Sequence, residues 1–95
     1  MARTRYLVTY DIATDDRRDS VFRALRDVGD PVQYSVFLCD LNDRELVAVT
    51  RKLRELIHER EDQVLMVDLG PCDGAAERIT SLGRVHNPPS RLVVV

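Results

Sequence analysis

The chain of 95 residues has few of the features that are typical of secreted proteins, of membrane-spanning proteins or of proteins stabilised by a structural metal ion. Its two cysteines, Cys39 and Cys72, lie far apart without CxxC or Cys/His ligand spacing, so we expect reduced thiols and no structural zinc site. No apolar run approaches the ~20 residues of a membrane-spanning helix. The first residues lead into a strand pattern without a signal peptide, so the sequence predicts a cytoplasmic protein with no membrane partner.

The chain also lacks a large excess of positive or negative charge and a glycine motif that would bind phosphate. The net charge is −2, so a nucleic-acid partner would need a local basic surface. Lys52 is the only lysine, and the remaining basic side chains are arginines, which suit bidentate phosphate contacts. There is no Gly-rich loop and no HExxH motif, and His58 lies in a charged stretch typical of a solvent-facing histidine. With 44% hydrophobic residues, the chain is not disordered.

Three apolar segments, 5–12, 32–41 and 63–69, have the β-branched and aromatic content of strands. The first carries apolar residues on both faces: Tyr6, Val8, Tyr10 and Ile12 on one, and Leu7 and Thr9 beside Asp11 on the other. A strand covered by helices on one side only would alternate more cleanly, so something else should cover the second face. The middle segment fits one long strand or two short strands that meet near Tyr34 and Ser35.

Two segments between these strands have helical periodicity. The first should begin at Thr14 or Asp15 and end before Gly29 and Pro31. The second should begin near Asn42, with Glu45 placed as in a capping box, and end in the charged stretch 59–62. Its apolar stripe consists of Leu46, Val49, Leu53, Leu56 and Ile57.

This order predicts one α/β (α+β) domain over 1–95: a ferredoxin-like βαββαβ sandwich with an additional C-terminal strand. Residues 71–95 should form a loop followed by that strand, because the chain ends in the strong strand former Leu92–Val95. An exposed strand of this kind tends to aggregate, so we expect it to join a sheet edge of its own chain or of a partner.

Chemistry could lie at three places in this plan. Asp11 ends an apolar strand, where it could cap the next turn, form a salt bridge or bind a metal. Arg17 and Arg18 begin a helix, where they could bind phosphate or remain solvated beside neighbouring aspartates. Ser35 could position Asp11 or a metal-bound water, or simply occupy a half-exposed strand. A lone carboxylate holds magnesium poorly, but a symmetric dimer would supply a second copy of Asp11.

Four segments, in this order, carry a family resemblance: YLVTYDI, DDRRDSVFRAL, VGDPVQYSVFLCDLN and QVLMVDLG. Through them the chain resembles the small CRISPR-associated endonuclease (endoribonuclease) of the spacer-adaptation complex. The resemblance covers roughly residues 5–69 and implies a ferredoxin-like homodimer packed through its sheets. It also implies that Asp11 and its copy in the second protomer bind Mg²⁺ or Mn²⁺.

The resemblance assigns further roles by position. Tyr10 and Ser35 fall on catalytic-site positions, Arg17 and Arg18 on nucleic-acid-binding positions, and Phe37 on a position that supports the site or the dimer. Many relatives carry an arginine where this chain has Pro31, so one phosphate contact of the family is missing.

Two functions follow from the resemblance. The first is Mg²⁺-dependent cleavage of RNA or double-stranded DNA during spacer acquisition for antiviral defence. The second is a non-catalytic scaffold that bridges dimers of the CRISPR integrase subunit on protospacer DNA. An RNA-recognition module is disfavoured because the signature aromatics of a central strand are absent.

Overall fold

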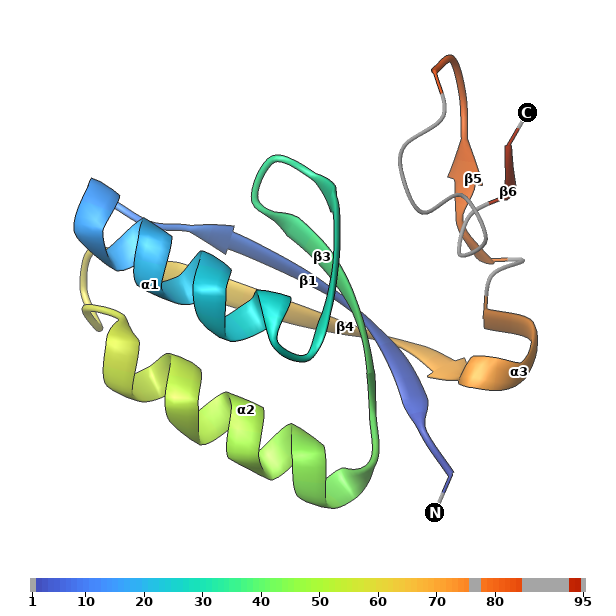
Figure 1. The fold of residues 1–95 in the computed structure, drawn as a ribbon, viewed down its shortest axis with the longest axis horizontal. Coiled ribbons are helices and arrows are strands. Elements are labelled where there is room, and N and C mark those ends of the chain that lie inside the picture. Colours follow the sequence, from blue (N-terminus) through green and yellow to red (C-terminus); the bar gives the residue numbers. More distant parts are fainter. Residues whose placement is uncertain (1, 76–77, 85–92, 95) are drawn as a thin grey trace.

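The computed structural model describes residues 2–75, 78–84 and 93–94. Its main sheet contains β1 (Thr4–Asp11), β2 (Gly29–Gln33), β3 (Val36–Leu41) and β4 (Gln63–Pro71), in the antiparallel order β2-β3-β1-β4. Helices α1 (Asp15–Arg26) and α2 (Asp43–Leu56) lie together on one face of this sheet (Figure 1). The predicted ferredoxin-like βαββαβ plan is confirmed. None of the described helices is long and apolar enough to cross a bilayer.

The middle apolar segment forms two strands and begins three residues earlier than predicted. Gly29 starts β2 because a side chain there would collide with the Leu38 carbonyl and the Cys39 sulfur of β3. Pro31 also lies within β2, and this is tolerated because β2 is the edge strand of the sheet. Of the two arrangements that the sequence left open, the structure has two strands that meet at a turn, where Ser35 has a left-handed φ of 61°.

Both helices begin where the sequence predicts. Thr14 caps α1 by accepting a hydrogen bond from the Arg17 amide. Asn42 and Glu45 form a reciprocal capping box at the start of α2, with distances of 2.8 and 2.9 Å. These bonds satisfy backbone donors that have no partner inside the helix.

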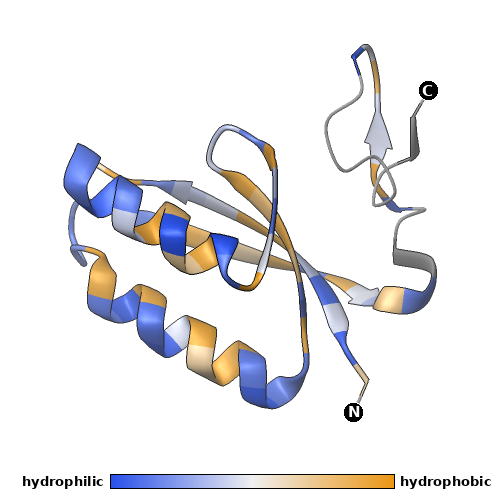
Figure 2. Ribbon diagram, viewed as in Figure 1, coloured by the Kyte–Doolittle hydropathy of each residue, from blue (hydrophilic) through white to orange (hydrophobic). Residues whose placement is uncertain are grey.

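The hydrophobic core lies between the helices and the sheet. Its fully buried members include Val8 of β1, Val21 and Leu25 of α1, and Phe37 of β3. Figure 2 shows hydrophobic residues along β1, β3 and β4 and recurring on both helices. Because strand side chains alternate between faces, this packing leaves a second apolar row on the face away from the helices.

That second row defines the open sheet face, which comprises Leu7 and Thr9 of β1, Leu65 and Val67 of β4, and Val36 of β3. Leu65 and Val67 remain 49% and 46% exposed. The first strand therefore has apolar residues on both faces although helices cover only one face of the sheet. The apolar residues on the other face remain as surface that another element or molecule could cover.

The C-terminal part of the chain, predicted as a loop followed by a strand over 71–95, contains more secondary structure than that. β4 continues through Gly70 and Pro71, and a short helix α3 (Cys72–Ala75) follows. The segments β5 (Thr80–Ser81) and β6 (Val93–Val94) then pair as a parallel two-stranded sheet. The predicted terminal strand thus joins its own chain over Val93 and Val94, and the rest of 85–95 lies outside the described residues.

Candidate functional site

Asp11 is the last residue of β1 and lies across from Gln63 of β4. Its register places it on the same face as Leu7 and Thr9, at one end of the open sheet face. Its side chain is exposed and makes no hydrogen bond or ion pair within the part of the chain that the structure describes. Thr14, not Asp11, caps the following helix. Among the described residues, Asp11 therefore neither caps the following helix nor forms a salt bridge.

Tyr10 and Phe37 lie on the opposite side of the sheet, under the helices. Tyr10 is 7% exposed, and its ring centroid is 6.3 Å from that of the fully buried Phe37. Phe37 in turn packs edge-on against Phe22 of α1, at 5.3 Å. Burial raises the pKa of the Tyr10 hydroxyl, and a hydrogen bond with the Ser35 side chain opposes that rise. Phe37 thus supports the strand of Asp11 from within the core, and strand alternation does not bring the Tyr10 ring to the face of Asp11.

Ser35 lies beside the end of β1, in the β2–β3 turn. Its carbonyl oxygen accepts a hydrogen bond of 3.1 Å from the amide of Tyr10, the residue before Asp11. The structure therefore places Ser35 beside the end of β1 through its backbone.

Arg17 is held by two acidic residues that precede β4. Its Nε donates to Asp62 over 2.7 Å, and its Nη2 donates to Asp62 over 3.2 Å and to Glu61 over 2.9 Å. The Asp62 side chain has no exposed surface and also accepts from the amides of Ala13 and His58, each at 2.8 Å. Arg17 and these amides lower the pKa of the Asp62 carboxyl well below its usual range.

Sequence reasoning missed Asp62, because it read 59–62 only as the charged end of a helix. An acidic residue directly before a strand carries no signal of burial, since its partners lie 45 and 49 residues away in the chain.

Arg18 is held more loosely than Arg17. One of its terminal nitrogens pairs with Asp15, whose side chain is 91% exposed, and the other donates to the carbonyl oxygen of Ile12 over 2.9 Å. The hydrogen bond to Asp15 chiefly raises the pKa of the Arg18 guanidinium. A pair with so exposed a partner contributes little to stability and exchanges readily with other anions.

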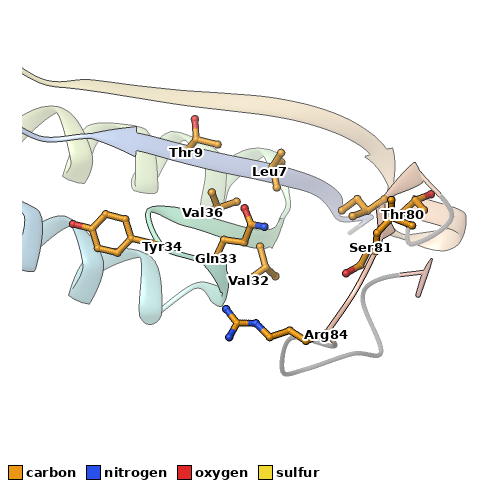
Figure 3. Close-up of a pocket in the computed structure, with 11 residues that line it drawn as sticks. Leu7, Thr9, Val32, Gln33, Tyr34, Val36, Thr80, Ser81 and Arg84 are labelled. Carbon is orange, nitrogen blue, oxygen red and sulfur yellow. The ribbon is translucent and has the colours of Figure 1, made fainter. Parts of the chain in front are cut away.

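A cleft of about 720 Å³ lies between the open sheet face and the segment 79–84. Figure 3 shows Leu7, Thr9 and Val36 on the sheet side, with Thr80, Ser81 and Arg84 on the C-terminal segment. The exposed ring of Tyr34 borders the same cleft at the β2–β3 turn. Asp11 is not among the lining residues, so this cleft adjoins the sheet face and not the carboxylate itself.

The described residues do not by themselves complete a metal site around Asp11. Within residues 2–75, 78–84 and 93–94, no three His, Cys, Asp or Glu side chains converge to hold an ion. An exposed, unpaired carboxylate suits Mg²⁺ or Mn²⁺, which are bound by one or two carboxylates with water and substrate phosphate. The residues present therefore fit such an ion if a second copy of Asp11 faces the first.

Fold and site together define a small ferredoxin-like domain with an isolated acidic residue at the end of its first strand. This chain belongs to the family described as CRISPR associated protein Cas2, whose sequence profile matches residues 4–73. The family predicted from the strand and helix motifs is thereby confirmed.

Relatives cover nearly the whole chain. The protein named CRISPR-associated endoribonuclease Cas2 from Geobacter sulfurreducens is 31% identical over 95% of both chains. A protein named CRISPR-associated endoribonuclease Cas2 1 from Rhodospirillum rubrum is 36% identical over 99% of this chain and 92% of its own. The crystal structure of Streptococcus pyogenes Cas2 has a TM-score of 0.74 and 32% identity, and the match covers 83% of this chain and 99% of that one.

Proposed function

We propose that this protein is a divalent-metal-dependent endonuclease that cleaves phosphodiester bonds in RNA or double-stranded DNA, in the cytoplasm, during CRISPR spacer acquisition. The relatives' name as CRISPR-associated endoribonucleases supports the reaction class. The observation that carries the proposal is Asp11 at the end of β1, whose side chain is exposed and has no partner among the described residues. An exposed carboxylate at this position remains available for a ligand from outside the chain.

The active form in this proposal is a homodimer packed through the open sheet faces. Leu65 and Val67 are half-exposed on that face, beside Leu7 and Thr9. Burying such a surface against a second copy is favourable at about 25 cal/mol per Å². Because Asp11 lies on the same face, this packing can bring two Asp11 carboxylates toward a common centre.

Asp11 and its copy in the second protomer would hold Mg²⁺ or Mn²⁺. When bound, the ion lowers the pKa of a coordinated water and offsets charge on the attacked phosphate. Ser35 and Tyr10 fix the strand end that carries Asp11. Arg18, with its exposed and exchangeable partner Asp15, is the arginine best placed to contact the substrate backbone.

The first experiment compares Asp11→Ala with Asp19→Ala. Asp19 is the matched control because it is an exposed aspartate on α1. Both variants and the wild type are purified with the same affinity tag. Asp11→Ala should lose Mg²⁺-dependent cleavage of labelled RNA and of duplex DNA, because it removes both metal-binding carboxylates of the dimer. Asp19→Ala should retain it. Equal cleavage by wild type and Asp11→Ala would identify a contaminating nuclease and overturn the proposal.

A non-catalytic scaffold is the second candidate function. Its support is the β5–β6 sheet, because each strand of a two-strand sheet leaves its outer backbone edge open to an added strand. In this role the tail would dock on the CRISPR integrase subunit, and the dimer would space two integrase dimers along protospacer DNA. Deleting Leu92–Val95 should then abolish spacer acquisition in cells, whereas Asp11→Ala should leave acquisition intact. The opposite pattern would refute the scaffold.

A further inference from the structure

The side chain of Asp62 joins three separate segments near the end of β1. Its two oxygens accept hydrogen bonds from the amide of Ala13, the amide of His58 and the guanidinium of Arg17. Ala13 belongs to the β1–α1 loop, Arg17 to the first turns of α1, and His58 to the α2–β4 loop. A carboxylate with no exposed surface and this many donors keeps its charge and fixes the groups around it.

These bonds act directly on the backbone that follows Asp11. The amide of Ala13 is bonded to Asp62, and the carbonyl of Ile12 is bonded to Arg18. The two residues after Asp11 are therefore tied on one side to α1 and on the other to the segment before β4. Within the part of the chain that the structure describes, no side-chain bond reaches Asp11 itself, so its carboxylate is available for a ligand while the backbone beside it is held.

Arg17 differs from Arg18 in the cost of leaving its partner. If Arg17 turned toward a phosphate, the Asp62 carboxylate would lose its cation and two of its four donor contacts. Charge-assisted hydrogen bonds are roughly twice as strong as neutral ones, so this loss is unfavourable. Arg18 can leave Asp15 at little cost in free energy, because the exposed Asp15 carboxylate is solvated by water.

We propose that Arg17 and Asp62 form a positioning pair, which holds the β1–α1 loop so that Asp11 keeps a fixed orientation, and that Arg17 is not a phosphate contact. This assignment rests on the proposed function in so far as Asp11 carries the chemistry. Under this proposal Arg17 positions the β1–α1 loop and does not bind substrate. Asp62, which the sequence did not single out, becomes part of the site.

The test uses Arg17→Gln, Asp62→Asn and the double variant in the full-length protein. Arg3→Gln is the matched control, because Arg3 forms a comparable bidentate pair with Glu45 at the other end of β1. Four quantities are measured: hydrogen exchange of the Ala13 amide by NMR, Mn²⁺ affinity, the separate kcat and KM for RNA cleavage, and the salt dependence of RNA binding without metal.

For a positioning pair, Asp62→Asn should speed exchange of the Ala13 amide about tenfold or more, while core amides of β1 and β3 stay protected. Mn²⁺ affinity should weaken about 10-fold, as for other residues that orient a metal ligand. Both single variants and the double variant should lose kcat to the same extent, with KM and the salt slope unchanged, because the two residues act as one unit.

A phosphate-binding Arg17 would give a different pattern. Arg17→Gln alone would then raise KM and reduce the salt slope by about one, and Asp62→Asn would do neither. That result would overturn the proposal, as would an Ala13 amide that exchanges in Asp62→Asn as slowly as in Arg3→Gln. If wild type shows no Asp11-dependent cleavage, the endonuclease function fails, and Ala13 exchange and Mn²⁺ affinity still decide the role of the pair.

Discussion

Single residues at the end of β1 show how burial sets the role of a charge. Asp11 and Asp62 are both aspartates near the start of α1, yet one is exposed and unpaired among the described residues and the other is enclosed by four donor contacts. The exposed carboxylate can bind an ion from outside, whereas the enclosed one can only organise its surroundings. The two arginines differ in the same way: the partner of Arg18 is exposed, whereas the Asp62 partner of Arg17 has no exposed side-chain surface.

Acid should weaken the fold through Asp62. Its pKa is lowered in the folded protein, so its contribution to stability is full above its unfolded value of about 4 and is lost as the pH falls toward the lower folded value. Thermal melts followed by circular dichroism should show the wild-type Tm falling below about pH 4, and Asp62→Asn should start lower and fall less. An equal acid-induced drop in both proteins would contradict this origin.

Phe37 should carry far more stability than the exposed aromatic residue of the same hairpin. It is fully buried against Tyr10 and Phe22, whereas Tyr34 is 81% exposed. Phe37→Ala should lower the free energy of unfolding in urea by about 3–5 kcal/mol. Tyr34→Ala should change it by about 0.5 kcal/mol or less. Similar losses in both variants would mean that the ring of Phe37 is not in the core.

At the scale of elements, end signals decide where each helix and strand begins. α2 begins with a complete capping box at Asn42 and Glu45, while the cap of α1 is a longer bond of 3.4 Å to Thr14. The β2–β3 turn needs a left-handed residue and uses Ser35, a conformation that an L-residue adopts at some cost. These local choices place Tyr10, Ser35 and the α1 arginines at one end of the sheet, beside Asp11.

The cap of α2 should be the more valuable of the two. Asn42→Ala should destabilise the protein by about 1 kcal/mol in urea unfolding, and Asn42→Gly by only a few tenths. Thr14→Ala should cost less than Asn42→Ala, because its side-chain bond is longer and no reciprocal bond accompanies it. The reverse order of the two alanine variants would show that the capping box does not control the stability of α2.

At the scale of the whole molecule, helices α1 and α2 cover one face of the sheet (Figure 1), and the other face keeps exposed apolar side chains among the described residues. A domain of 95 residues buries a modest share of its surface, so an added interface raises its stability substantially. The segment 79–84 covers only the part of this face beside β1, β2 and β3, where it forms the cleft of Figure 3. The β4 part, with Leu65 and Val67, stays exposed.

If the proposed homodimer packs through the open sheet face, a charge on that face should separate it. Leu65→Glu should sediment as a monomer at concentrations at which wild type is dimeric, because an unpaired carboxylate would be buried in the interface. Val47→Glu is the matched control, since Val47 is 58% exposed on α2, on the opposite side of the sheet. Sedimentation equilibrium distinguishes the two, and a dimeric Leu65→Glu variant would exclude packing through this face.

The sequence alone determined the order of the main elements, the starts of the two helices and the prominence of Asp11, because these depend on local periodicity and on residues a few positions apart. It left open whether 32–41 forms one strand or two, and the structure shows two that meet at Ser35. It misplaced the start of β2, since Gly29 and Pro31 read as helix stops until an edge position and a close contact with β3 admit them. Only the tertiary structure decided that Arg17 is held by Asp62 and Glu61, that Phe37 lies under the helices and that Asp62 binds the Ala13 amide beside the end of β1. Those outcomes depend on contacts between residues far apart in the chain, which local patterns do not encode.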